Sequence, residues 1–299
     1  MLNTIISLQP RTVTEGGARP EDMVFKTCVD LEKGVPDLFD IDAIMAAVAP
    51  RPDPEPLKVV LYQECDRYNK LLLRMKGTLG ALQKGIQGTI VITSELEAIF
   101  DALLIGRVPA QWAFCYPSLK PLGLWVRDLA ARVAQLQRWS MGEMPKVFWL
   151  SGFTYPTGFL TAVLQTTARR NGLAIDTLEF EFPIIFETEA QIKESPKEGV
   201  YVQGLFVEGA KWNKDDSCLA EPDPMQLFDF LPLIHFNPIE SRKGAAAKGI
   251  YRSPMYLYPH RTGSRERPSF MGVIELKSGL VEPEFWTQRG TAVLLALAT

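Results

Sequence analysis

Apolar residues recur at steps of three and four along the first half of the chain, which is the spacing of an amphipathic helix. The longest stripe begins after Pro56 and consists of Leu61, Cys65, Tyr68, Leu72, Met75, Leu79, Leu82 and Ile86. A second helix is predicted after Pro117, with Ser118 as its N-cap and Pro121 in its first turn. Its apolar positions are Leu122, Val126, Leu129, Val133 and Leu136. Further helices are predicted at 156–171, 21–33, 40–48 and 94–105.

Beyond Gly172 the period of the pattern changes to two. Residues 178–182 alternate apolar and charged side chains, as a strand with one buried face does. Further strands are predicted at 200–207, 231–236, 251–257, 270–276 and 291–297. Short strands without intervening helices favour an antiparallel sheet or a small barrel over a parallel βαβ sheet. The predicted class is α+β, with a helical domain over residues 1–172 and a β domain over residues 173–299.

Composition narrows the class of protein. The chain has 299 residues, 46% hydrophobic and 22% charged, so it is long enough for about two domains and too apolar for extensive disorder. A net charge of −3 provides no positive field to collect the phosphates of a nucleic acid. No apolar run approaches the ~20 residues of a membrane helix, and the N-terminus lacks a signal-peptide pattern. We expect an intracellular protein with neither a nucleic-acid partner nor a membrane partner.

Candidates for catalysis and cofactor binding are few. The sequence contains no glycine-rich loop ending in Gly-Lys-Ser/Thr, so ATP binding by this chain is not expected. The cysteines show neither metal-ligand nor disulfide spacing, so no metal site is predicted. They are Cys28, Cys65, Cys115 and Cys218.

Ser151 and His235 define an alternative hypothesis, a free-standing ligand-binding barrel or serine hydrolase. Ser151 precedes the third predicted helix and is the serine placed most like a nucleophile, and His235 would be its base. A cap or loop hydroxyl is the favoured interpretation of Ser151, and a packed imidazole is that of His235.

Basic residues gather between positions 240 and 267, where seven stand against two acidic ones. The candidate docking contacts among them are Arg242, Lys243, Arg252, Arg261 and Arg265. A solvated loop edge is the favoured interpretation, and docking of an acidic surface is the functional alternative.

Several runs of sequence are more specific than composition. They are Tyr-Pro-Ser-Leu-Lys-Pro-Leu-Gly at 116–123, Phe-Trp-Leu-Ser-Gly-Phe at 148–153, Val-Gln-Gly-Leu-Phe-Val-Glu-Gly-Ala-Lys-Trp at 202–212 and Arg-Gly-Thr-Ala-Val-Leu-Leu at 289–295. Together they resemble the C-terminal region of dynein heavy chains, over nearly the whole chain, and the first run is similar to axonemal rather than cytoplasmic heavy chains. The signature residues, to which we assign a structural role, are Pro117, Ser118, Leu119, Lys120, Pro121, Trp149, Ser151, Gly152, Phe153, Gly204, Glu208, Gly209, Trp212, Arg289 and Gly290.

The resemblance implies a helical bundle followed by a small, incomplete antiparallel β-barrel that packs on the AAA+ ring of the same heavy chain. It implies no catalytic group and no cofactor in this chain, since ATP and Mg²⁺ belong to other modules of the heavy chain and microtubules bind to a separate stalk. The expected role is to modulate ATP-driven, minus-end-directed motility. The expected partners are the ring and other subunits of the dynein complex, and the expected location is the cytoplasm and cytoskeleton, in the axoneme of a cilium or flagellum.

Overall fold

The computed structural model describes residues 19–48, 55–116, 118–241, 248–258 and 269–297. Its contacts divide the chain into two compact units. The first contains Met1–Ala47 and Tyr62–Gln137, and the second contains Val48–Leu61 and Arg138–Ala298. The predicted boundary at residue 172 stays a prediction, although the contacts group residues 138–172 with the strands that follow.

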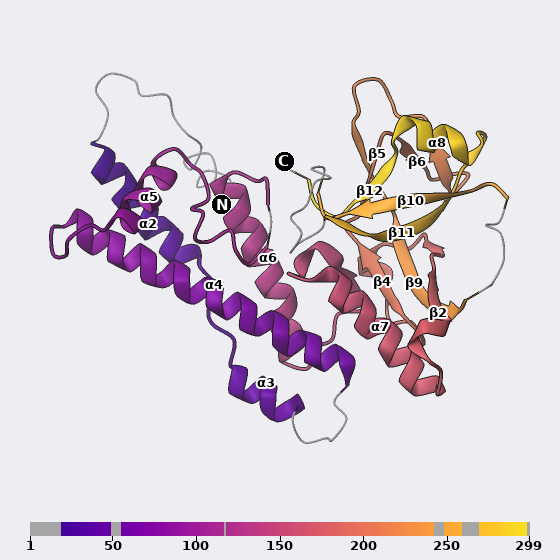
Figure 1. Ribbon diagram of the computed structural model, residues 1–299, viewed down its shortest axis with the longest axis horizontal. Coiled ribbons are helices and arrows are strands. Elements are labelled where there is room, and N and C mark those ends of the chain that lie inside the picture. The colour runs from indigo at the N-terminus through magenta and orange to yellow at the C-terminus, as the bar shows by residue number, and fades with distance from the viewer. Residues whose placement is uncertain (1–18, 49–54, 117, 242–247, 259–268, 298–299) are drawn as a thin grey trace. The chain divides into compact units, whose positions relative to one another are not determined.

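Helices make up the regular structure of the first unit (Figure 1). They are α2 (Pro20–Gly34), α3 (Ile41–Val48), α4 (Pro56–Ile86), α5 (Ser94–Leu104) and α6 (Leu122–Ser140), of which α3, α4 and α6 extend into the second unit. The long stripe on α4 is confirmed, because its positions from Leu61 to Leu82 are all buried. Side chains also tie α4 to the irregular segments before α3 and α6. The side-chain amide of Asn69 accepts from the backbone N–H of Phe39 and donates to its carbonyl, and the Trp112 indole N–H donates to Thr78 Oγ1 at 3.1 Å.

The predicted start of the second long helix is wrong. Helix α6 begins at Leu122, four residues after Ser118. The Ser118 hydroxyl instead accepts a hydrogen bond from the backbone N–H of Lys120 at 3.2 Å, so it stabilises an irregular turn ahead of the helix. Pro121 precedes the helix and does not lie in its first turn.

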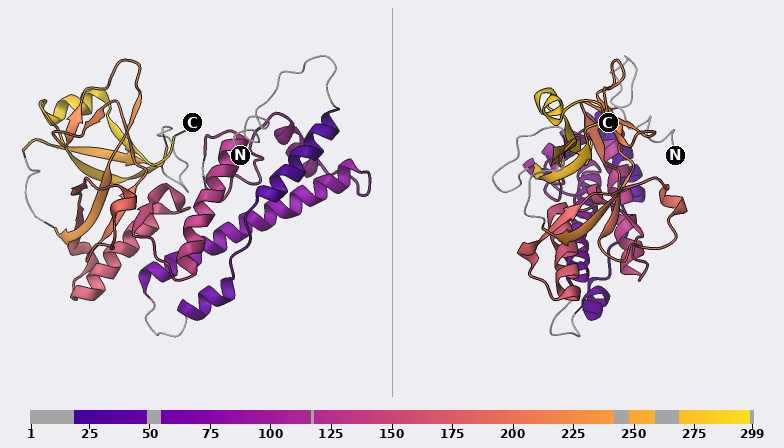
Figure 2. Two further views of the ribbon diagram at one scale, coloured as in Figure 1. Left: turned by 180° about the vertical axis from the view of Figure 1, so that it is seen from behind. Right: turned by 90° about the vertical axis from the view of Figure 1, so that its right-hand side faces the viewer.

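Mixed sheets and helix α7 form the second unit. The first sheet has the order β1-β4-β9-β2, with β3 also paired to β9, and its strands are β1 (Val147–Trp149), β2 (Leu178–Glu181), β3 (Ile184–Ile185), β4 (Val200–Gln203) and β9 (Leu233–Glu240). Helix α7 (Pro156–Asn171) lies against β2 and β9 and ends at Gly172, whose φ is +65° (Figures 1 and 2). Short 3-10 turns lie at η1 (Leu150–Gly152), η2 (Ile175–Thr177) and η3 (Glu189–Gln191).

The second sheet has the order β11-β10-β12-β5-β8. Its strands are β5 (Phe206–Glu208), β8 (Phe228–Phe230), β10 (Ile250–Tyr256), β11 (Phe270–Lys277) and β12 (Ala292–Leu294). A hairpin of β6 (Lys211–Asn213) and β7 (Cys218–Ala220) and a short helix, α8 (Pro283–Arg289), complete the unit. The predicted strand 200–207 is two strands, because the chain turns at Gly204 and passes from the first sheet to the second.

The prediction of a purely antiparallel sheet is wrong at two pairs. β1 pairs with β4 in parallel, and β10 pairs with β12 in parallel. In the second case helix α8 follows β11 and turns the chain round, so that β12 runs in the direction of β10. The described fold is therefore mixed α/β. Its sheets are not closed into a barrel within the described ranges, and the helical bundle and incomplete barrel stay predictions.

Aromatic side chains fill the core beneath β1 and α7. Phe153 stacks on Phe159 with ring centroids 4.3 Å apart, and Phe148 lies 4.8 Å from Phe159 and 5.5 Å from Trp139. Their burial supplies the apolar area that stabilises this layer. None of the helices that the structure describes combines the length and the apolar composition needed to cross a membrane.

Candidate functional site

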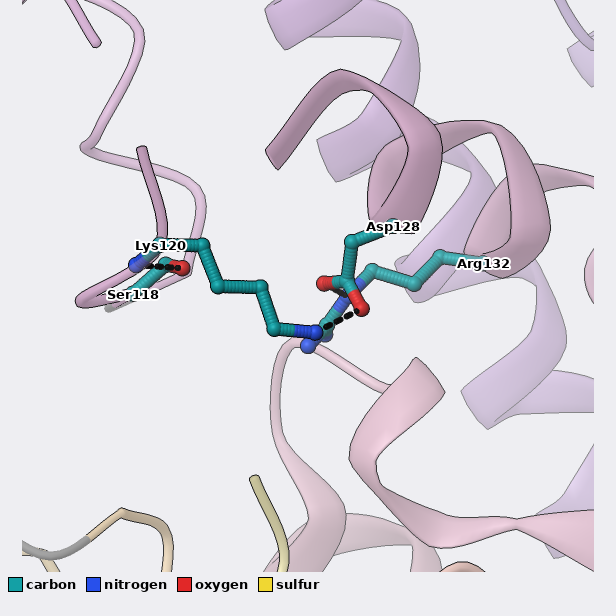
Figure 3. A network of polar contacts seen from close by, with 4 residues as sticks. All are labelled: Ser118, Lys120, Asp128 and Arg132. Carbon is teal, nitrogen blue, oxygen red and sulfur yellow. Dashed lines mark hydrogen bonds and ion pairs between the residues drawn. The ribbon is translucent and has the colours of Figure 1, made fainter. Parts of the chain in front are cut away.

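A buried ion-pair network lies in the first unit, between α6 and the segment that precedes this helix (Figure 3). Asp128 accepts hydrogen bonds from Lys120 Nζ at 2.8 Å and from Arg132 Nε at 2.7 Å. The Asp128 and Arg132 side chains are only 5% and 4% exposed, and that of Lys120 is 19% exposed. Asp128 and Arg132 are four residues apart on α6 and therefore share a face of the helix. The turn held by the Ser118 hydroxyl positions Lys120.

An aromatic stack begins at the guanidinium of Arg132. Its Cζ lies 4.0 Å from the centroid of the Tyr116 ring, a cation–π geometry. Tyr116 stacks on Trp125 at 5.7 Å, and Trp125 stacks on Trp112 at 6.2 Å. The network therefore joins the segment before α6 to the interior of the first unit.

Electrostatics fixes the charge states of this network. Burial alone would raise the pKa of Asp128, but the Arg132 charge and the hydrogen bonds from Lys120 and Arg132 outweigh it and hold the pKa below its usual value. Burial raises the pKa of the Tyr116 phenol, which stays neutral. A neutral phenol and a fully paired carboxylate provide neither a nucleophile nor a general base, so the geometry suits a structural role.

The lowered pKa of Asp128 predicts a pH dependence. A carboxyl whose pKa is lower in the folded state stabilises the fold above its unfolded pKa, about 3.9, and this contribution is lost as the pH falls through the lower folded pKa. We expect the difference in unfolding free energy between the parent and Asp128→Asn to stay constant from neutral pH to about pH 5 and to shrink below about pH 4. Urea unfolding across this range measures it, and a difference that shrinks between pH 7 and 5 would contradict the assignment.

The structure does not support the hydrolase alternative. Ser151 is buried in the turn η1, where its neighbours are the signature residue Gly152 and Leu150. The His235 ring lies on β9, and its Nε2 donates to the backbone carbonyl of Glu198 at 2.8 Å, so this nitrogen cannot take a proton from a serine. His235 also packs edge-on against Tyr201, as expected of a structural imidazole.

Neither a metal-binding site nor a catalytic thiol site is assembled in the described part of the chain. No group of three or more His, Cys, Asp or Glu side chains is close enough there to hold a metal ion. All four cysteines are buried, and none of them forms a disulfide. Burial raises the pKa of Cys28 and of Cys65 to about 12, so these thiols stay protonated and unreactive at neutral pH.

Trp149 and Gly204, two of the signature residues, meet at the end of β4. Gly204 has a φ of +76°, and a Cβ on it would lie 2.6 Å from Cδ1 of the Trp149 ring. Both observations require glycine at this turn between the two sheets. Phe153, the last signature residue of the run 148–153, belongs to the aromatic core.

The other signature residues of the second unit surround strand β5 and helix α8. Glu208 lies on β5 opposite Ala292, and the Trp212 backbone N–H donates to Asp229 Oδ2 at 2.8 Å. Gly209 and Gly290 adopt left-handed conformations, with φ of +74° and +72°, and Gly290 ends α8. Arg289 lies 3.8 Å from Glu221 and stacks over the Phe285 ring. These residues make turns and caps, and their structural role stays a prediction.

The signature and docking residues that remain lie on the surface or outside the described residues. Leu119 and Pro121 are exposed on either side of Lys120. Of the docking candidates, Arg252 lies on β10, where its exposed side chain is 3.8 Å from Glu275 on β11. Pro117, Arg242, Lys243, Arg261 and Arg265 lie outside the described residues.

Sequence reasoning missed the role of Asp128 and Arg132. Their four-residue spacing was a visible signal, because an acid and a base at that distance on a helix face each other. Lys120 could not be paired with them in advance, because it lies in an irregular segment.

Comparison with known proteins identifies the family. The family profile for the C-terminal domain of the dynein heavy chain matches residues 1–295. The protein is 52% identical, over its whole length, to the dynein-1-beta heavy chain of the flagellar inner arm I1 complex of Chlamydomonas reinhardtii. It is 46% identical to human dynein axonemal heavy chain 2 and 37% identical to human dynein axonemal heavy chain 1, each over 99% of its length. It spans 7% of the length of each of these relatives. The resemblance seen in the sequence is thus confirmed, and the chain belongs to the dynein heavy chain family, as a C-terminal domain of the axonemal type.

Proposed function

We propose that this chain is a non-catalytic regulatory domain that packs on the AAA+ ring of an axonemal dynein heavy chain. In this role it modulates ATP-driven movement toward microtubule minus ends in a cilium or flagellum. ATP and Mg²⁺ act in other modules of the heavy chain, microtubules bind through segments outside this sequence, and the partners are the ring and other dynein subunits. The helical bundle and the incomplete barrel belong to the same proposal.

The observation that carries the proposal is the match of the whole chain to one small part of long motor proteins. A domain of this kind acts through its surface. In the second unit the residues before and on the edge strand β8 expose apolar side chains: Met225 is fully exposed, and Leu227 and Phe230 are each 71% exposed. Exposed apolar residues close together in sequence are typical of a surface that another protein covers.

A domain without catalytic groups changes motor output through differential binding. If it contacts two conformations of the ring unequally, it shifts their populations, and a difference of ~1.4 kcal/mol is enough for a tenfold shift. This coupling requires a domain that keeps its own shape, which the buried network of Asp128 and the aromatic core favour.

The test is the ATPase rate of a heavy chain that lacks its own C-terminal region. We expect the purified 299-residue chain to change the microtubule-stimulated rate of the truncated Chlamydomonas relative, saturably and by about twofold or more, because the docked domain shifts the ring equilibrium. Addition of an equal amount of serum albumin is the control. An ATPase rate that stays unchanged at every concentration of the domain would contradict the proposal.

A further inference from the structure

A cavity of about 80 Å³ lies in the second unit, outside the features described so far. One face of α7, which includes Val163, Thr167 and Arg170, forms one wall. The segment that enters β1 and the loop 195–199 that enters β4 form the others. A water molecule needs about 10–15 Å³ of such space, so the cavity has room for a group the size of a carboxylate.

Positive charge dominates the lining of the cavity. Lys146, Arg170 and Lys197 line it, and Glu198 is the acidic residue among the lining side chains. The Glu198 carboxylate is already held, because it accepts hydrogen bonds from Thr167 Oγ1 at 2.8 Å and from Arg170 Nη1 at 3.1 Å. Lys146 and Lys197 are exposed, and within the described residues neither is paired with an acidic side chain, so two positively charged residues without acidic partners stand at the edge of the cavity.

The loop that closes the cavity is held in place from three sides. Arg170 Nη1 donates to the backbone carbonyl of Lys197 at 2.7 Å, and His235 Nε2 donates to that of Glu198. Gly199 follows with a φ of +71°, and a Cβ there would lie 2.1 Å from the Phe236 carbonyl oxygen. The ligand therefore meets a preformed site and does not have to order the loop, which lowers the entropic cost of binding.

Apolar side chains complete the lining and discriminate between classes of anion. Leu57, Met144, Phe148 and Val163 all contribute. A free phosphate ion would place this apolar surface against a strongly hydrated group, whereas a peptide can offer a carboxylate to the lysines and an adjacent apolar side chain to Met144, which is 44% exposed.

We propose that this cavity is a docking site for an acidic peptide segment of a partner protein, in which a carboxylate binds Lys146 and Lys197 and a neighbouring apolar side chain contacts Met144. This docking site is independent of the proposed regulatory function, because binding of the peptide does not require the domain to change the activity of the motor.

Selection from a random peptide library displayed on phage tests this docking site. Against the immobilised 299-residue chain, we expect enrichment of peptides with Asp or Glu next to Leu, Ile or Phe. A selected peptide with a fluorescent label should bind the Lys146→Glu/Lys197→Glu variant about tenfold or more weakly, since both cations are reversed. The matched control is Lys26→Glu/Lys214→Glu, which reverses two exposed lysines that do not line the cavity and should bind as the parent does.

A second readout locates the peptide on the parent chain itself. In the parent chain with ¹³C-labelled methionine methyl groups, the selected peptide should shift the Met144 resonance, which the Met144→Leu variant assigns. Peptides without acidic residues, equal binding to the two lysine variants, or an unmoved Met144 signal would each overturn the proposal. Displacement of the peptide by inorganic phosphate at constant ionic strength would also overturn it, because the cavity would then be a simple anion site.

Discussion

The Asp128→Ala variant is expected to lose about 3–5 kcal/mol of unfolding free energy relative to the parent chain. Removal of this carboxylate breaks the ion pair to Arg132, whose side chain is 4% exposed, and removes the negative charge that lies between Arg132 and a second cation, Lys120. A buried charge that loses an ion pair keeps its desolvation penalty and loses the attraction that offset it. Urea unfolding followed by tryptophan fluorescence measures the loss, since Trp112 and Trp125 are buried near the network.

An exposed pair on α4 provides the matched control. Asp66 and Lys70 have the same four-residue spacing and an N–O distance of 2.7 Å, but their side chains are 36% and 63% exposed. We expect Asp66→Ala to change the unfolding free energy by less than about 1 kcal/mol, because solvent screens the pair. The Asp128→Leu/Arg132→Met double variant should recover part of the loss, because it removes both charges of the buried pair together and leaves Lys120, which is 19% exposed, as the remaining cation. If Asp128→Ala and Asp66→Ala lose the same unfolding free energy, burial of the network does not increase the cost of removing the carboxylate.

Replacement of Gly199 by alanine is expected to lower the unfolding free energy by about 2–4 kcal/mol. The residue has a φ of +71°, which strains any side chain, and the new Cβ would lie 2.1 Å from the Phe236 carbonyl oxygen. That oxygen belongs to β9, which is paired on both sides, so it cannot move away without breaking the sheet. Thermal unfolding followed by circular dichroism measures the change.

Gly249 separates the two causes of this loss. Its φ is +76°, close to that of Gly199, but a Cβ there meets nothing within 4 Å. Gly249→Ala should therefore show only the cost of the left-handed backbone, about 1–2 kcal/mol. If Gly199→Ala is no more destabilising than Gly249→Ala, the close approach to Phe236 has no energetic consequence.

The long helices could be predicted from the sequence because their patterns span many turns. The stripe on α4 extends over eight apolar positions, and α7 has a proline at its start and Gly172 at its end. Such signals depend on neighbours along the chain, so they survive without knowledge of the tertiary fold. The start of α6 was misplaced because a serine before a proline-rich segment can stabilise a turn as well as a helix.

The parallel strand pairs could not be predicted, for physical reasons. β1 has three residues, too few to show a period, and its partner β4 lies about fifty residues further along the chain. The parallel pairing of β10 with β12 depends on helix α8, which was also missed although Pro283 and Gly290 stand at its two ends as start and stop signals.

The cavity could not be predicted from the sequence either. Its cations come from three separate segments of the chain, so only the fold brings them together.

The speed at which a heavy chain moves microtubules tests the central claim most directly. The Chlamydomonas relative would be prepared in three forms: intact, truncated before the region that matches this chain, and truncated with this chain fused in its place. We expect truncation to change the gliding velocity by about twofold or more and the fusion to restore it, because the domain shifts the ring between conformations. The same velocity for all three forms would contradict the regulatory role.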